Sequence, residues 1–269
     1  YSDFDYEVDL AFEPSAFSVL SGIKNVNFRH EFNYFISENS RFMLGYDMLS
    51  HNITPGQLIA DENAIVHPMK IQERNGREQT IYVSNEFRPA PNWIFNAGIR
   101  LNTFRLYGPG DFYKYENGML SETITYTKKE IVKSYFSPER RLNITHIINP
   151  VQSVKMSYST HTQHIHKITA TENLSLPVDI WMMSGNNVKP QTSDLFSFGY
   201  FRNKQNDMYQ FAAEAYYKLM HDQIDVKNGA DVMANQHIEG ELLFGKGRSY
   251  GLELMLKKKY GKLNGWIGY

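Results

Sequence analysis

The sequence predicts an all-β fold, and more narrowly an antiparallel up-and-down β-barrel that spans a membrane. Segments of about ten residues alternate between apolar and polar side chains, which is the period of a strand with one face toward lipid. Short and long connections alternate along the chain, as in barrels that keep their turns on one side of the membrane and their loops on the other. The 269 residues include 18 Tyr and 17 Phe, which suits strands with aromatic girdles.

The clearest strand covers residues 209–219. Its odd positions are apolar or aromatic, including Phe211, Ala215 and Leu219, whereas its even positions include Glu214 and Lys218. Tyrosines stand near both ends of the apolar face. A length of about eleven residues is enough for one tilted crossing of a bilayer.

The first half of the chain predicts two hairpins after an initial strand. The expected strands are residues 2–12, 26–36, 42–48, 81–87 and 93–101. Short turns are expected at 37–40 and 90–92, because polar and Pro or Asn residues separate the alternating runs there. Residues 14–22 and 54–77 are expected to be loops.

The second half repeats the arrangement. The expected strands are residues 142–148, 154–163, 196–200, 209–219 and 250–256, with a last one starting at Gly265. Short turns are expected at 149–152, 203–207 and 261–264, and long loops at 107–137, 167–192 and 221–246. The total is about eleven strands. We expect both ends to be cuts, so that residues 1–269 form one partial barrel domain.

Strand periodicity also predicts which way side chains point. The lipid-facing set is Trp93, Phe95, Ile99, Phe211 and Leu254, with Phe211 expected at mid-bilayer depth. The lumen-facing set is Arg100, Lys155, Glu214 and Glu253. Charged residues are the expected lining of a wet barrel interior, so the carboxylate pairs Glu214 with Glu253 and Glu31 with Asp47 are interpreted as lining and not as catalytic pairs.

No recognisable catalytic motif is present, and we predict that the chain is not an enzyme and holds no cofactor. His146, His161, His164 and His166 lie close in sequence, but His164 and His166 have the opposite strand parity to His161, so no metal site is predicted. The chain has no cysteine and a net charge of −1, which excludes thiolate metal sites and a basic field for nucleic acid.

Candidate ligand contacts come from the loops and the lumen. Loops carry function in barrels, and aromatic rings stack equally well on sugars and on metal chelates. The candidate ligand-binding residues are Phe112, Tyr113, Tyr115, His161, Trp181 and Arg100. Two alternatives remain open at this point: a membrane barrel with adhesive or enzymatic loops, and a soluble all-β carbohydrate-binding module.

From about residue 142 onward the chain resembles the barrel of TonB-dependent outer-membrane receptors, particularly those of Bacteroidota. The resemblance lies in the order of several short motifs: Asn149-Pro150, then Leu176-Pro177-Val178-Asp179, then Lys189-Pro190-Gln191, and last Ser249-Tyr250-Gly251-Leu252-Glu253. The first half fits the same strand pattern with fewer such motifs.

The resemblance implies a place in the bacterial outer membrane and about eleven strands of a 22-stranded, plugged barrel. It implies import of a scarce siderophore, haem, vitamin or glycan, a small molecule or oligosaccharide in each case. It also implies contact with outer-membrane lipid, with the TonB complex through an N-terminal part absent here, and with a surface lipoprotein.

Overall fold

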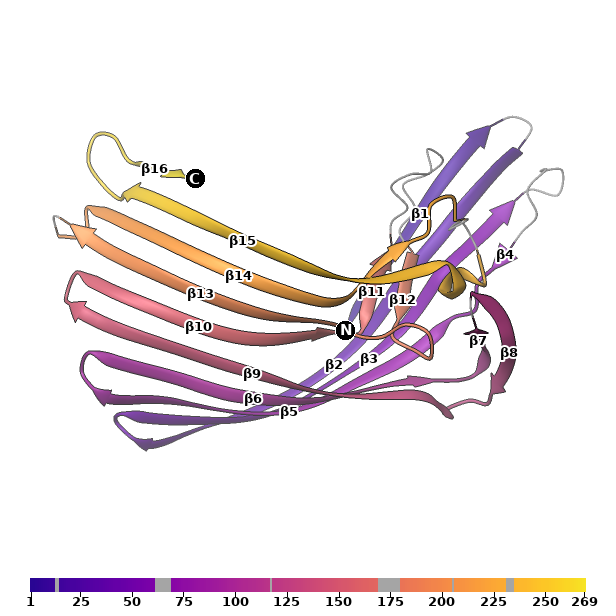
Figure 1. Cartoon of the computed structure of the whole chain (residues 1–269), viewed down its shortest axis with the longest axis horizontal. Coiled ribbons are helices and arrows are strands. Elements are labelled where there is room, and N and C mark those ends of the chain that lie inside the picture. The colour runs from indigo at the N-terminus through magenta and orange to yellow at the C-terminus, as the bar shows by residue number, and fades with distance from the viewer. Residues whose placement is uncertain (13–14, 61–68, 117, 169–179, 205, 231–234) are drawn as a thin grey trace.

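The computed structural model describes residues 1–269 except 13–14, 61–68, 117, 169–179, 205 and 231–234. One large, strongly curved antiparallel sheet makes up most of the described chain (Figure 1). Its strands are β1 (Ser2–Phe12), β2 (Ser15–Ser37), β3 (Ser40–Ala60), β4 (Met69–Lys70), β5 (Arg74–Ala90), β6 (Trp93–Tyr107), β9 (Ile131–Asn149), β10 (Gln152–Gln163), β13 (Gln191–Lys204), β14 (Tyr209–Val226), β15 (Leu242–Lys258) and β16 (Gly265–Gly268). No helix in the described part is long and apolar enough to cross a membrane.

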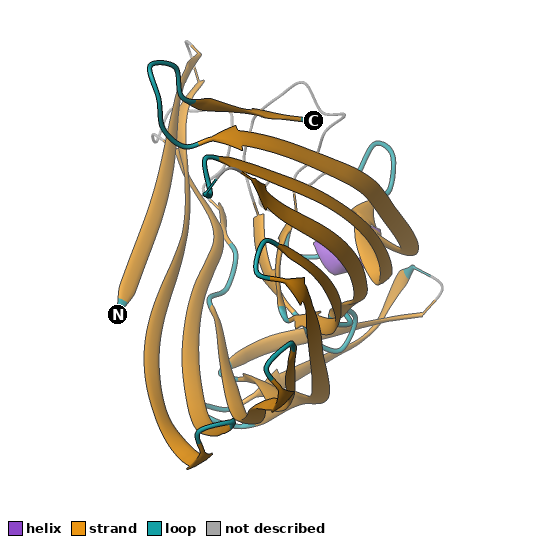
Figure 2. Cartoon of the chain, turned by 90° about the vertical axis from the view of Figure 1, so that its left-hand side faces the viewer, coloured by secondary structure: helices purple, strands orange, loops and turns teal. Residues whose placement is uncertain are grey.

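The sheet has up-and-down topology. Within the described residues, eleven strands follow one another in the order β1-β2-β3-β5-β6-β9-β10-β13-β14-β15-β16, and β4 pairs with β3. The connections β2–β3, β5–β6, β9–β10, β13–β14 and β15–β16 are short and lie together at one end of the sheet (Figure 1). Seen from that end, the sheet curls around an open interior without β1 meeting β16 (Figure 2). The predicted fold class, strand number and sidedness of the turns are confirmed.

The strands are longer than the sequence suggested. β2 has 23 residues and β3 has 21, about twice the 9–11 residues that a crossing requires. Most of the region expected as a loop at 14–22 therefore belongs to β2. The expected loop at 107–137 contains a hairpin of β7 (Gly110–Glu116) and β8 (Met119–Tyr126). Amphipathic periodicity marks only the lipid-facing part of a strand, so the extensions beyond it carry no such signal.

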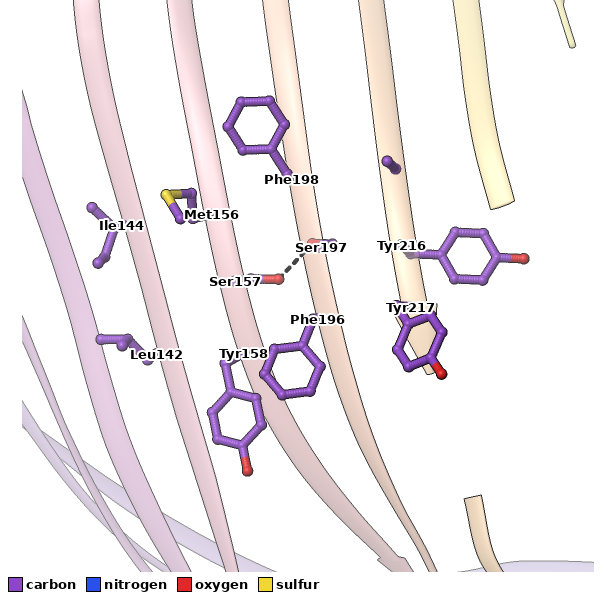
Figure 3. A pocket seen from close by; sticks show the side chains of 11 residues that line it. Leu142, Ile144, Met156, Ser157, Tyr158, Phe196, Ser197, Phe198, Tyr216 and Tyr217 are labelled. Carbon is purple, nitrogen blue, oxygen red and sulfur yellow. Dashed lines mark hydrogen bonds between the residues drawn. The ribbon is translucent and has the colours of Figure 1, made fainter. Parts of the chain in front are cut away.

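The convex face of the sheet is apolar and exposed. Trp93, Ile99, Phe211 and Leu254 are 36–38% exposed, in agreement with their predicted lipid-facing direction. A shallow apolar hollow of about 450 Å³ on this face is shown in Figure 3, where Met156 is the cross-strand neighbour of Phe198 and Tyr158 that of Phe196. An apolar surface that follows this many strands exceeds the patches that soluble monomers expose, so the soluble-module alternative does not fit.

The concave face is polar near the turns. Lys155 lies opposite Gly199, Gly199 opposite Glu214, and Glu214 opposite Glu253. This register places three of the four predicted lumen residues, Lys155, Glu214 and Glu253, in one row across four strands, and Arg100 lies elsewhere on the same face. Phe211, in contrast, is only two residues from the start of β14, so it lies nearer the turn-side interface than the mid-bilayer depth expected for it.

Candidate ligand-binding site

The long connection between β10 and β13 folds back into the concave side of the sheet as a hairpin. Its strands, β11 (Ile165–Ile168) and β12 (Ile180–Met183), pair antiparallel, and β12 packs against β3 and β2 (Figure 1). Met183 joins Ile53 and Phe104 in a buried cluster. Burial of these apolar side chains holds the hairpin against the wall, so the chain itself narrows the lumen.

His164 lies at the start of this hairpin and is 1% exposed. Its ring stacks on Phe104 with 4.7 Å between the ring centroids and 6° between the planes. Among the described residues, neither ring nitrogen has a hydrogen-bond partner. Burial lowers the pKa of His164 to about 4, so the imidazole is neutral at pH 7. An unpaired buried polar group of this kind costs about 1–3 kcal/mol, which a bound partner would offset.

Glu78 lies beside His164 on the wall of the lumen. Its carboxylate accepts a hydrogen bond from Asn102 Nδ2 at 3.1 Å, and His51 Nε2 lies 3.6 Å from Glu78 Oε1. The other nitrogen of His51 is 2.7 Å from Asn25 Oδ1. These contacts join β2, β3, β5 and β6 and fix the direction of the carboxylate.

A cavity of about 520 Å³ opens toward the lumen next to these residues. Its lining is mainly uncharged and hydrogen-bonding, with Glu78 and Lys218 as the charged groups. The polar uncharged lining consists of His161, Thr162, Gln163, His164, Gln191, Thr192, Ser193 and Gln223. This volume is within the range of small-molecule sites. Amides, hydroxyls and the neutral imidazole of His164 favour a polar ligand of low charge, because such a ligand can pair with them without a large desolvation cost.

A second cluster ties the outer loops together above the lumen. The hydroxyl of Tyr115 is 3.1 Å from His237 Nδ1, and the Tyr113 ring centroid is 4.6 Å from that of His237. Asn187 donates to the Tyr113 carbonyl at 2.7 Å and to the Glu239 carboxylate. Burial raises the pKa of Glu239 and that of Tyr115. These contacts connect three loops that are far apart in sequence. We call the cluster of Tyr113, Tyr115, Asn187, His237 and Glu239 the outer platform.

The six candidate ligand residues fall into four different places. Tyr113 and Tyr115 belong to the outer platform and His161 to the lumen cavity. Arg100 lies on the lumen wall, where its Nε is 3.5 Å from Glu139 Oε2. Trp181 lines a small cavity of about 40 Å³ beside the buried cluster. Their roles in binding stay predictions, since no ligand contact tests them.

Phe112 has surroundings that differ from those of an open loop aromatic. It is 4% exposed, packs in the buried cluster with Phe104, and lies under the Arg74 guanidinium at 4.1 Å. A ligand could reach Phe112 only after β7 and β8 move. The residue therefore has a clear structural role in seating that hairpin on the wall.

Sequence reasoning missed most of the cavity lining. The sequence predicts a loop for Gln191 and Thr192, and the strand parity of His164 predicts that it points away from His161. The turn from β10 into β11 reverses that parity and brings His161 and His164 to the same cavity. His146 points the other way and lies against Trp93 in a tilted arrangement, with 4.2 Å between the ring centroids. Among the described residues, no group of three or more His, Cys, Asp or Glu could hold a metal ion.

Comparison with known families decides the relationship of this chain. The family model described as TonB dependent receptor-like, beta-barrel, matches residues 1–269. The chain belongs to the TonB-dependent receptor β-barrel family. No curated protein sequence matches it significantly.

Solved structures with the same fold are members of this receptor class. The copper transporter OprC matches with a TM-score of 0.65 and 11% identity over 99% of this chain and 43% of its own. The iron transporter FrpB from Neisseria meningitidis matches with a TM-score of 0.59 and 11% identity over 94% of this chain and 35% of its own. The alcaligin receptor FauA from Bordetella pertussis matches with a TM-score of 0.52 and 10% identity over 99% of this chain and 46% of its own. The chain therefore spans less than half the length of these proteins.

As part of a TonB-dependent receptor barrel, the chain lies in the outer membrane of a Gram-negative bacterium. The exposed convex band is then the lipid-facing surface, and the concave face is the receptor lumen. The end with short turns faces the periplasm, and the end with the β7–β8 and β11–β12 hairpins faces outward. The lumen cavity and the outer platform both lie toward the outward end.

Proposed function

We propose that this chain is part of a TonB-dependent receptor that imports a scarce ligand, of the class of siderophores, haem, vitamins or glycans. The single observation that carries the proposal is the polar cavity of about 520 Å³ beneath the inward-folded hairpin. It lies in a family barrel, it opens into the lumen, and a buried unpaired imidazole borders it. The names of the similar structures, which include iron and copper transporters and a siderophore receptor, support import as the general activity.

The proposal extends to the missing parts of the receptor. Residues 1–269 would form one part of a 22-stranded barrel whose plug and TonB-contacting segment belong to the rest of the protein. The motifs from Asn149-Pro150 to Ser249-Tyr250-Gly251 support a receptor of the Bacteroidota type, with a surface lipoprotein as partner at the outer end. The chain carries no catalytic function in this scheme.

Growth and uptake by the full-length receptor test this proposal. A deletion strain is complemented with the wild type or with the variant Gln163→Leu/Gln191→Leu, and grown with limiting iron chelate, haem, vitamin or glycan. Loss of two or three hydrogen bonds to ligand is expected to weaken ligand affinity about tenfold or more. The matched control Gln210→Leu changes an amide on the same lumen face at the periplasmic end and is expected to leave uptake unchanged.

Two results would contradict the proposal. One is a deletion strain that grows like the wild type on all four nutrient classes. The other is a cavity variant that takes up ligand as well as the wild type while the receptor is present at normal level in the outer membrane.

A further inference from the structure

The convex face of the sheet carries two arginines directly opposite each other, outside the lipid-facing band. Arg77 on β5 is in register with Arg105 on β6. Both share the face of Ile81 and Leu101, a register pair that is 57% and 40% exposed and lies four residues nearer the turns. Like charges in direct cross-strand register destabilise a sheet unless an anion lies between them.

A cavity of about 500 Å³ brings two lysines close to this pair. Arg77, Tyr107, Lys128 and Lys129 are among its lining residues. The two lysines come from the tight turn that leads into β9, which is closed by a hydrogen bond from the Glu130 amide to the Thr127 carbonyl at 3.1 Å. Three cations therefore line one cavity on the outward part of this face, and Arg105 lies beside them in register with Arg77.

These four cations lack acidic partners within the part of the chain that the structure describes. Arg77 Nε donates to Ser50 Oγ at 3.1 Å, and Arg105 donates to Gln79 Oε1 at 3.4 Å, so both arginines bond neutral groups. No carboxylate of the described residues lies within ion-pair distance of Arg77, Arg105, Lys128 or Lys129. The acidic residues nearby are engaged elsewhere: Glu73 pairs with Lys70 at 3.6 Å, and the Glu130 carboxylate accepts from Thr127.

The position of the cluster indicates its partner. It lies on the membrane side of the wall, just beyond the apolar band on the outward end, next to Tyr107, which lines the same cavity. Tyrosines at this depth mark the boundary between acyl chains and headgroups. Paired guanidinium groups bind phosphate oxygens with well-defined geometry. The lumen and its ligand lie on the opposite face of the same strands.

We propose that Arg77, Arg105, Lys128 and Lys129 form a binding site for the phosphate of an outer-leaflet lipid headgroup. The phosphate offsets the repulsion between the two arginines, and the acyl chains of the same lipid lie along the apolar band below. A free phosphate ion has the same oxygen chemistry, but it gains nothing from that apolar surface, so the lipid is the expected occupant. This site is independent of the ligand that the receptor imports.

The experiment measures lipid binding by the purified full-length receptor in detergent, with native mass spectrometry as the readout. The probe is bis-phosphorylated lipid A, and the comparison probes are dephosphorylated lipid A and inorganic phosphate. The variant is Arg77→Gln/Arg105→Gln/Lys128→Gln/Lys129→Gln. The matched control is Lys257→Gln/Lys262→Gln, which removes two cations at the periplasmic end. Heat-modifiable migration on gels establishes that each barrel is folded.

The proposal predicts that the wild type and the control retain lipid A equally. The fourfold variant is expected to bind it about tenfold or more weakly, since loss of one charge-assisted hydrogen bond already corresponds to about that factor. Removal of the phosphates from the probe should have a similar effect. Equal binding of lipid A by the folded fourfold variant would overturn the site. Competition by inorganic phosphate at the same concentration as lipid A would overturn the lipid as its occupant.

Discussion

Arginine substitution at Leu252 tests the depth and direction of the strands most directly. Leu252 is 54% exposed on the convex face and lies in register with Ala215 of β14. Ala215 is six residues beyond Tyr209, where β14 begins. With a rise of about 3.3 Å per residue and a tilt of about 45°, this places Leu252 about 14 Å from the turn side. The apolar band of such barrels is about 25 Å tall, so Leu252 is near the midplane.

The expected cost of Leu252→Arg follows from that depth. Arginine at the midplane of a barrel's lipid face destabilises folding by about 2–4 kcal/mol, and this falls to about 0–1 kcal/mol near an interface. Phe211 is only about 5 Å from the turn side by the same geometry, so Phe211→Arg should cost clearly less than Leu252→Arg. The next residue, Glu253, faces the lumen opposite Glu214. Glu253→Arg replaces a repulsive pair by an attractive one, worth about 0.2–1 kcal/mol in the stabilising direction.

The assay is reversible folding of the full-length receptor into lipid vesicles from urea, followed by tryptophan fluorescence. From the most to the least stable variant, the expected order is Glu253→Arg, Phe211→Arg and Leu252→Arg. Equal effects of Leu252→Arg and Glu253→Arg would refute the reasoning, because they would mean that these two neighbouring residues do not face lipid and lumen respectively. A larger loss for Phe211→Arg than for Leu252→Arg would show instead that the assigned depth is wrong.

Three further predictions concern the lumen side. Burial lowers the pKa values of His164 and His166 in the fold from the ordinary 6.5 to about 4, so the unfolded hairpin binds more protons between pH 6.5 and about 4. The stability of β11 and β12 should therefore fall as pH decreases through this window, seen as faster amide exchange; His164→Phe should remove part of the effect, and His164→Phe/His166→Phe should remove it. Ser184→Ala removes the hydroxyl that lies 2.9 Å from buried His166 Nε2. The local stability of the same hairpin should fall by about 1–3 kcal/mol, measured as faster amide exchange. Unchanged exchange would mean that a water molecule takes the place of the hydroxyl. A Cβ at Gly45 would overlap the Tyr82 ring on the lumen face, so Gly45→Val should lower the urea midpoint by the equivalent of about 1–3 kcal/mol, and a Tyr82→Ala background should rescue it.

A large part of the fold was predictable from local patterns. Alternation along residues 209–219 gave both the strand and its lipid-facing side, because neighbouring side chains of a strand always point to opposite faces. Turns such as Asn149-Pro150 were predictable because their residues favour turn conformations. The depth of a residue in the membrane was less predictable, as Phe211 illustrates. The alternating pattern marks the apolar band but not the residue at which a strand enters it.

The sequence by itself determined the class of fold, the order of the strands and which side chains face lipid or lumen, since each depends on residues close together in the chain. Only the tertiary structure decided which distant residues meet. His164 reaches Phe104 and the Glu78 cavity because the β10–β13 connection folds inward onto β3, and Arg77 opposes Arg105 because of the register between β5 and β6. Register and loop docking are set by packing over the whole sheet, so no local pattern contains them.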